Sequence, residues 1–257
     1  MDHLIKIKRV ANACVLIQIG DYHILTDPFF KNWPIIGIRE PIGIEVEDLP
    51  PLTAIIGCHD FIDHWQMSSM KNYKHDKNKV QIFVARRSMV RKARKFGFRN
   101  SYVLKWGDKL NLTNDLLIEA VKAQKILGLL SVNNYVLSLG QTSVFFGSEA
   151  RNIEPLEQYY ANNGPVDIAL LPTNSVHLFG LYKLVLNGAE AVKATQILRA
   201  RALVVIHDAH PSIPGLIHVK SSGADAERMA AQLPEPKVDV VRISPGTQWE
   251  YNRSQKY

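Results

Sequence analysis

The residues best suited to chemistry lie in one short loop of this sequence. Positions 58–64 read C-H-D-F-I-D-H, and they follow the apolar run 52–57, which is typical of a buried strand. Imidazole and carboxylate groups together suit borderline divalent metals and leave positions open for water. A polar turn with helix-capping aspartates is the alternative interpretation. Two histidines and two aspartates in so short a span favour the metal site.

The elements that must position this loop follow a recognisable order along the chain. Apolar alternation predicts strands at residues 5–9, 14–19, 23–25, 52–57, 80–85, 101–104, 116–121, 133–139, 142–146, 167–171, 202–207 and 238–243. Helical spacing predicts helices at residues 65–70, 86–96, 153–160, 188–200 and 224–232. The stretch 29–51 is expected to be a long loop. This order predicts an α/β fold with two sheets packed face to face and helices outside, in a single domain over residues 1–257.

The net charge of +7 has a local source. Residues 71–99 hold eleven Lys or Arg residues and one Asp, a local charge of +10, so the rest of the chain carries −3. The basic stretch 86–99 lacks the interleaved aromatic residues that stack on bases, so nucleic-acid binding is not expected. An anionic substrate or a lipid headgroup could still use this charge, and we expect an anionic small molecule as the substrate.

The sequence shows neither a secretion signal at its start nor an apolar run long enough to cross a bilayer, so we expect a soluble, cytoplasmic protein. The two cysteines, Cys14 and Cys58, are too few for a disulfide framework and are expected to be buried apolar residues. The oligomeric state is left open, and a homo-oligomer is compatible with the sequence.

Several segments resemble the metallo-β-lactamase superfamily, in particular the branch that looks like ascorbate-6-phosphate lactonase and the phospholipase D that releases N-acylethanolamines. They are the opening hairpin at 10–17 and 24–29, with its strand-ending Asp-Pro, and the approach to the loop at 47–56. The resemblance spans most of the chain and implies a four-layer αββα sandwich of two mixed sheets. The family's H-x-H-x-D-H motif reads H-D-F-I-D-H here.

Part of the family's metal-binding pattern is missing from this sequence. His59 and His64 match the first and last histidines of the motif and Asp63 matches its aspartate, but Phe61 replaces the second histidine. In the segment 123–125, Lys125 stands where the family has its next histidine. Neither replacement can bind a metal ion, so the resemblance implies that one of the family's two metal sites is lost.

The ligands of the other metal site are kept in the sequence. The resemblance assigns this site to Asp63, His64, Glu149, which replaces the usual bridging Asp, and His207 in the segment 204–208. We therefore predict a mononuclear site that binds one divalent metal ion. Zn²⁺ or Mn²⁺ suits these ligands, with Fe²⁺ as a further candidate.

Three residues near these ligands are candidates for catalysis. His59 or Asp60 would act as general acid or base, and Lys125 would stabilise developing negative charge. A structural role for His59 and a solvated Lys125 are the alternatives. Asp27, at a strand end, is expected to be a turn residue or a partner that orients a ligand histidine.

Two further histidines are candidates for substrate binding. His177 follows a buried strand, at the sheet end where the resemblance places the ligands. His210 lies three residues after His207 and could reach the same pocket, although capping of the loop before Pro211 is the favoured interpretation.

Three functions fit this site. The first is a metal-dependent hydrolase acting on an ester, a lactone or a phosphodiester. The second is a repurposed lyase, isomerase or redox enzyme of a specialised pathway, and the third is a catalytically inactive protein that binds a ligand. Phe61 and Lys125 are the evidence for both alternatives.

Overall fold

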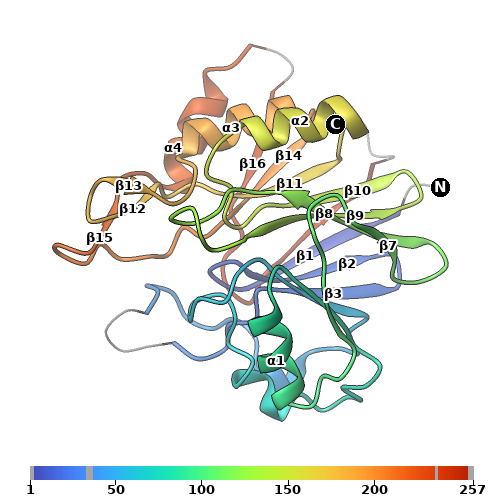
Figure 1. Ribbon diagram of the computed structural model, residues 1–257. Helices are drawn as coiled ribbons and strands as arrows, with labels where there is room; N and C mark the ends of the chain where they lie inside the picture. The colour runs from blue at the N-terminus through green and yellow to red at the C-terminus, as the bar shows by residue number, and fades with distance from the viewer. Residues whose placement is uncertain (1–2, 33–36, 235–236, 254–257) are drawn as a thin grey trace.

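Two large β-sheets packed face to face form the centre of the protein (Figure 1). The computed structural model describes residues 3–32, 37–234 and 237–253. The first sheet has the strand order β17-β1-β2-β3-β4-β5-β6, and the second has the order β16-β14-β11-β10-β9-β8-β7. A small third sheet has the order β13-β12-β15.

The strands of the first sheet are β1 (Ile5–Ala11), β2 (Cys14–Ile19), β3 (Tyr22–Thr26), β4 (Ala54–Gly57), β5 (Gln81–Val84), β6 (Ser101–Val103) and β17 (Gln248–Tyr251). Those of the second sheet are β7 (Lys109–Asn111), β8 (Leu116–Lys122), β9 (Asn133–Leu139), β10 (Thr142–Phe146), β11 (Ile168–Pro172), β14 (Ala202–Ile206) and β16 (Asp239–Val241). The third sheet contains β12 (Val176–Leu178), β13 (Tyr182–Lys183) and β15 (Ile217–Val219). Both large sheets contain parallel and antiparallel pairs.

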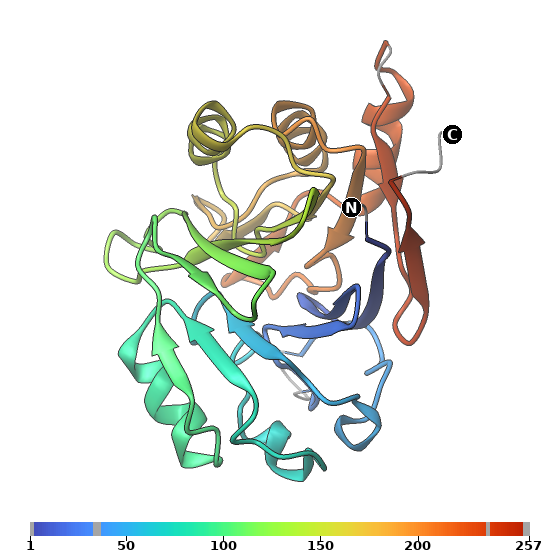
Figure 2. The same ribbon diagram turned by 90° about the vertical axis from the view of Figure 1, so that its right-hand side faces the viewer.

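Helices cover the outer faces of both large sheets. Helix α1 (Arg87–Lys95) lies against the first sheet, while α2 (Glu154–Asn163), α3 (Gly188–Ile197) and α4 (Gly223–Ala231) lie over the second (Figure 1). Figure 2 shows α2 and α3 end-on above that sheet. The expected α/β sandwich of two mixed sheets with helices outside is confirmed.

Apolar side chains from the inner faces of the two sheets hold the sandwich together. Ile7 and Ile17 of the first sheet and Leu137 and Phe146 of the second are fully buried in one cluster between the sheets. Removing this apolar surface from water is the main term that stabilises such a core. Separate clusters lie beneath α1 and beneath α2–α4.

The parallel strands bring their carboxyl ends to one edge of the sandwich. Strands β3 and β4 pair in parallel in the first sheet, and β10, β11 and β14 do so in the second. The residues that follow these five strands include Asp27, His59, Glu149, Asn174 and His207. Polar groups from both sheets therefore meet at one edge, where α/β proteins commonly bind ligands.

The expected elements agree with the structure in most places but not all. The helix expected at 65–70 is absent; a short 3₁₀ helix at Ser69–Asn72 follows instead, because Trp65 belongs to a tight turn closed by its backbone bond to Phe61. Strands β7, β12, β13, β15 and β17 were not expected. The loop expected at 29–51 contains only a 3₁₀ turn, Val46–Asp48, among its described residues; positions 33–36 lie outside them.

Candidate metal centre

The four expected metal ligands converge at this edge. His64 Nε2 lies 3.3 Å from Asp63 Oδ2, 3.2 Å from Glu149 Oε1 and 3.0 Å from His207 Nε2. His207 Nε2 lies 3.3 Å from Glu149 Oε1 and 4.0 Å from Asp63 Oδ2. All of these side chains except the partly exposed Asp63 are buried.

Two more histidines extend this cluster. His59 Nε2 lies 3.3 Å from Glu149 Oε1, and His210 Nε2 lies 3.4 Å from Asp63 Oδ2. The donor atoms fall into two groups, within each of which they lie within 4.8 Å of one another. One group is His59, His64 and Glu149, and the other is Asp63, His207 and His210. His210 therefore reaches the cluster, whereas the sequence favoured a loop cap.

Buried partners fix the orientation of His64. Asp27 Oδ2 lies 2.8 Å from His64 Nδ1 and also accepts a hydrogen bond from the Ser148 hydroxyl, while Asp27 Oδ1 accepts one from the Cys58 backbone N–H. A carboxylate can only accept, so Nδ1 of His64 carries the proton. Its Nε2 lone pair then faces the cluster, which is the tautomer that a metal ligand needs. Of the two roles expected for Asp27, the contact with His64 favours that of a partner that orients a histidine.

A weaker contact orients His207 in the same sense. Asn174 Oδ1 lies 3.4 Å from His207 Nδ1. The amide oxygen is an acceptor, so this contact favours a proton on Nδ1 and a lone pair on Nε2. The backbone of His207 is held by its N–H bond to Asn12 O, in a left-handed conformation with φ 55° directly after β14.

His59 has the opposite arrangement. Its Nδ1 accepts a hydrogen bond of 3.2 Å from the backbone N–H of Phe61, so the proton of the neutral ring is on Nε2. That N–H points to the Glu149 side of the cluster. Phe61 makes an edge contact with the imidazole ring of His59 and is 38% exposed, so it contributes an apolar ring and no metal ligand beside the cluster.

The charges around the cluster shift the pKa values of its members. Burial alone would raise the pKa of Glu149, but His59 and His207 outweigh it and hold that pKa well below its usual range. Burial likewise opposes ionisation of Asp63, and His64 and His210 reverse its effect on the pKa. Both carboxylates are therefore ionised at neutral pH.

The pKa values of the two facing histidines, His64 and His207, shift in opposite directions. Burial lowers the pKa of His207 to about 4, with His210 adding to the effect. Burial also disfavours charge on His64, but Asp63 and Asp27 raise its pKa well above the usual value. At neutral pH His207 is thus a neutral imidazole, and His64 holds a proton that a metal ion would displace.

The donor set fits a divalent metal ion. The buried His210 Nε2 has no hydrogen-bond partner among the described residues, although it lies near the Asp63 carboxylate. Buried polar atoms are normally satisfied, so unpaired ones facing a shared space indicate a missing partner. Imidazoles and ionised carboxylates are ligands for Zn²⁺, Mn²⁺ and Fe²⁺.

Asp60 lies in the same loop, but its side chain is bound elsewhere. Its carboxylate accepts hydrogen bonds of 2.7 Å from Arg86 and from Ser88, at the start of α1. Lys92 donates to the Asp60 backbone carbonyl at 3.3 Å. Asp60 thus ties the loop to the basic helix, and its carboxylate is absent from both groups of donor atoms.

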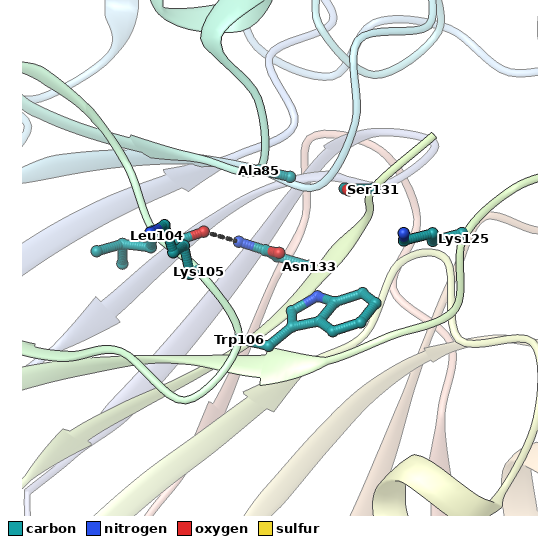
Figure 3. A pocket seen from close by; sticks show the side chains of 7 residues that line it. All are labelled: Ala85, Leu104, Lys105, Trp106, Lys125, Ser131 and Asn133. Carbon is teal, nitrogen blue, oxygen red and sulfur yellow. Dashed lines mark hydrogen bonds between the residues drawn. The ribbon is translucent and has the colours of Figure 1, made fainter. Parts of the chain in front are cut away.

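Lys125 is exposed and lines a cavity of about 340 Å³. The cavity lies beside the loop at residues 58–64, which we name the metal loop. In Figure 3 its ammonium group points toward Ser131 and Asn133, across from Ala85. The backbone N–H of Asn133 donates to Cys58 O at 3.3 Å, so the cavity adjoins the start of the loop. Its other lining residues are Leu104, Lys105 and Trp106.

His177 lies in the third sheet, where it faces His218 in the register of β12 and β15. Its Nε2 lies 3.2 Å from the Ser175 hydroxyl. It therefore stands apart from the two donor groups, and a role in substrate binding stays a prediction.

Sequence reasoning missed two partners of the ligands, Ser148 and Asn174. Both follow parallel strands of the second sheet, β10 and β11. A polar residue directly after a buried apolar strand is the signal that could have identified them. Cys14 and Cys58 are both buried free thiols, as expected.

The sequence matches the family described as beta-lactamase superfamily domain over residues 22–207. The chain belongs to this family. The metal loop, Glu149 and His207 all fall inside the matched region, with His207 as its last residue. No curated protein matches the chain.

Several solved structures share the fold of this chain. The metallo hydrolase Igni18 from the archaeon Ignicoccus hospitalis has a TM-score of 0.73 at 14% identity, with 96% of this chain and 98% of that one covered. An isothiocyanate hydrolase from Delia radicum gut bacteria has 0.71 at 17%, with 96% and 99% covered. The diiron β-hydroxylase CmlA from Streptomyces venezuelae has 0.72 at 16%, but the match covers 97% of this chain and only 54% of that longer one.

The described residues contain no helix that is both long enough and apolar enough to cross a membrane.

Proposed function

We propose that the protein is a metal-dependent hydrolase that holds one divalent ion between Asp63, His64, Glu149 and His207. One observation carries this proposal: His64 Nε2 and His207 Nε2 face each other at 3.0 Å, and hydrogen bonding at each Nδ1 favours a lone pair on both. A proton on His64 lies between the two nitrogens in the metal-free protein, and a divalent ion would displace it and bind both. The ionised carboxylates on either side favour the doubly charged ion.

The hydrogen bonding of His59 supports one ion rather than two. Its Nδ1 accepts from the Phe61 backbone, so its Nε2 presents a proton instead of a lone pair to the cluster. Phe61 and Lys125 replace the two other histidines that the resemblance assigns to the lost metal site. His59, Phe61 and Lys125 therefore do not suit a metal ion at the lost site. The contacts among Asp63, His64, Glu149 and His207 support an ion at the other site.

The remaining polar groups fit hydrolysis of an ester, a lactone or a phosphodiester. A bound divalent ion would supply Lewis acidity toward the substrate oxygen and lower the pKa of water. His59, with a proton on Nε2 and Glu149 beside it, is positioned to give a proton to a leaving group as general acid.

The cavity of Figure 3 favours an anionic substrate. Lys105 and Lys125 are its charged lining residues, and Trp106 adds an apolar wall. Two ammonium groups beside the metal loop would bind a carboxylate or phosphate group and offset charge that develops during hydrolysis. Ligand cavities of a few hundred Å³ hold small molecules.

Metal content of protein purified without added metal tests the metal proposal. We expect a ratio near one ion per chain by elemental analysis, and a large loss in the His64→Ala and His207→Ala variants. His75→Ala is the matched control and should keep the parent's content, because this exposed histidine contacts the Leu49 carbonyl and belongs to neither donor group. A ratio near two ions per chain contradicts the proposal of a single ion. A parent protein that contains no metal contradicts the metal site altogether.

A substrate panel tests the hydrolase proposal separately. Protein loaded with Zn²⁺, Mn²⁺ or Fe²⁺ is assayed against aryl esters, lactones and phosphodiesters. Turnover that disappears in His207→Ala supports hydrolysis. Failure of fully loaded protein on every substrate contradicts it while leaving the metal site standing.

A non-hydrolytic redox enzyme is the second candidate, because the cluster contains a further group of three donors that includes His210. The structurally similar CmlA is a diiron β-hydroxylase. Two iron atoms per chain together with oxygen consumption would favour this candidate over the hydrolase.

A further inference from the structure

Three tight turns of the chain expose large apolar side chains to solvent. Each contains a glycine with positive φ: Gly128, Gly180 and Gly215. The apolar residues next to these glycines, which we name the apolar tips, are Leu127 (53% exposed), Leu129 (81%), Phe179 (63%), Leu181 (89%) and Leu216 (37%). Single exposed apolar residues are ordinary, but a contiguous group of them marks an interaction surface.

Two of the tips adopt backbone conformations that bulky residues disfavour. Leu127 has φ 51° and Phe179 has φ 52°, in the left-handed region. Hydrogen bonds hold both in place: Leu127 N–H donates to Tyr182 Oη at 2.8 Å, and Phe179 N–H donates to Leu216 O at 2.8 Å. The turns are thus joined to one another, and their geometry directs the apolar groups outward.

The surroundings of the apolar tips are basic. Segments 122–131, 175–187 and 209–222, which contain the three turns, include four lysines and neither Asp nor Glu. Lys220 Nζ donates to the carbonyl of Gly180 at 3.1 Å, directly beside two tips. Of the other three lysines, Lys122 is exposed, Lys125 is exposed and lines the cavity of Figure 3, and Lys183 pairs with Glu190.

We propose that the apolar tips dock on the surface of an anionic lipid bilayer. Apolar side chains on separate protruding turns can enter the boundary between headgroups and acyl chains, while surrounding lysines are attracted to anionic lipids. A symmetric dimer through the same surface would bring these lysines against their own copies, which is unfavourable. Charge complementarity therefore selects the lipid surface over a second copy of the chain.

The docking surface lies at the same end of the molecule as the metal cluster. The turn at Gly180 joins β12 and β13, which Figure 1 shows projecting beside the large sheets. Asn174, shortly before β12, contacts His207, and His210 lies on the segment that leads to β15. This proposal does not rest on the proposed function, because its observations concern only the surface.

Co-sedimentation with vesicles tests the docking proposal on the full chain. We expect the protein to bind phosphatidylcholine vesicles that contain phosphatidylglycerol, to bind pure phosphatidylcholine vesicles more weakly, and to lose affinity as salt rises. The triple variant Leu129→Ser, Phe179→Ser, Leu181→Ser should bind the anionic vesicles at least about tenfold more weakly. Leu110→Ser, at an exposed apolar residue on β7 outside the apolar tips, is the control and should bind like the parent.

Three outcomes would overturn the proposal. The parent could fail to bind anionic vesicles, or the triple variant could bind them as well as the parent does. In the third, light scattering shows a parent dimer that the triple variant abolishes, without vesicle binding by either; the tips then serve self-association. The substituted side chains are largely exposed, and far-UV circular dichroism with urea unfolding verifies that the variant is folded.

Discussion

Asp27 Oδ2 lies 2.8 Å from His64 Nδ1, and neither side chain is accessible to solvent. This pair joins the end of β3 to the metal loop that follows β4. It also settles which nitrogen of His64 faces Glu149 and His207. A residue that touches no metal thus decides whether its neighbour can bind one.

Replacing this carboxylate should weaken metal binding. Asp27→Asn keeps the shape but removes the charge that holds the Nδ1 proton of His64, so we expect metal affinity to fall by about 10- to 100-fold. Competition with a chromogenic chelator measures it. Asp21→Asn, in an exposed turn, is the control, and equal affinities in the two variants would contradict the orienting role.

His59 should be separable from the metal ligands. In His59→Gln we expect the metal content to remain near that of the parent, while the rate on the best substrate falls by about 10²- to 10⁴-fold, the usual contribution of a general acid. Elemental analysis and kcat are measured on the same preparation. Loss of the metal from this variant would show instead that His59 is a ligand.

Asp60 should contribute a pH-dependent part of the stability. Burial opposes its ionisation, but Ser88 and Arg86 outweigh it and lower the pKa of the carboxyl below the ordinary value. The stabilisation is therefore fully present above the unfolded-state pKa of about 3.9 and is lost as the pH falls through the folded-state pKa. Urea midpoints of the parent and Asp60→Asn should differ most near neutral pH and approach each other in acid. A difference that does not change with pH would contradict the ion pair.

Arg9 should be one of the most sensitive positions for stability. It is buried and joins Asp208 at 2.6 Å and Glu40 at 3.0 Å, directly beside the metal cluster. Arg9→Met removes the guanidinium that both carboxylates face and leaves two largely buried negative charges together, so we expect a loss of about 3–5 kcal/mol in the free energy of unfolding. Lys6→Met removes only the exposed pair with Glu250 and should cost less than about 1 kcal/mol. Similar urea unfolding curves for the two variants would sink this expectation.

Most of the fold could be predicted from the sequence because long strands carry a clear apolar signal. Strand β4 is entirely buried between parallel neighbours, and its apolar run was unmistakable. The missed strands β7, β12, β13, β15 and β17 are short and mostly half-buried or exposed, so they lack that signal. The helix expected at 65–70 does not form, because Trp65, Met67 and Met70 reach the core from a turn and a short 3₁₀ helix.

The site was predictable where its residues follow parallel strands, and less so where their partners are remote in sequence. Glu149 and His207 came from the resemblance and lie together with His64. The interaction of Asp60 with Arg86 spans 26 positions and left no local pattern. His210 was placed in a loop cap because only the folded chain brings Asp63 within 3.4 Å of it.

His64 and His207 are separated by 143 positions in the sequence, so an ion bound between them would affect the stability of the whole fold. An ion shared by these two residues closes a long chain loop and ties the two sheets together at one edge. Because the folded chain brings the two histidines together and the unfolded chain does not, the ion would stabilise the folded state, and this effect would grow with free metal concentration. Chelation should therefore lower the melting temperature and expose the edge to proteolysis, so resistance to heat and protease would report metal occupancy without any substrate.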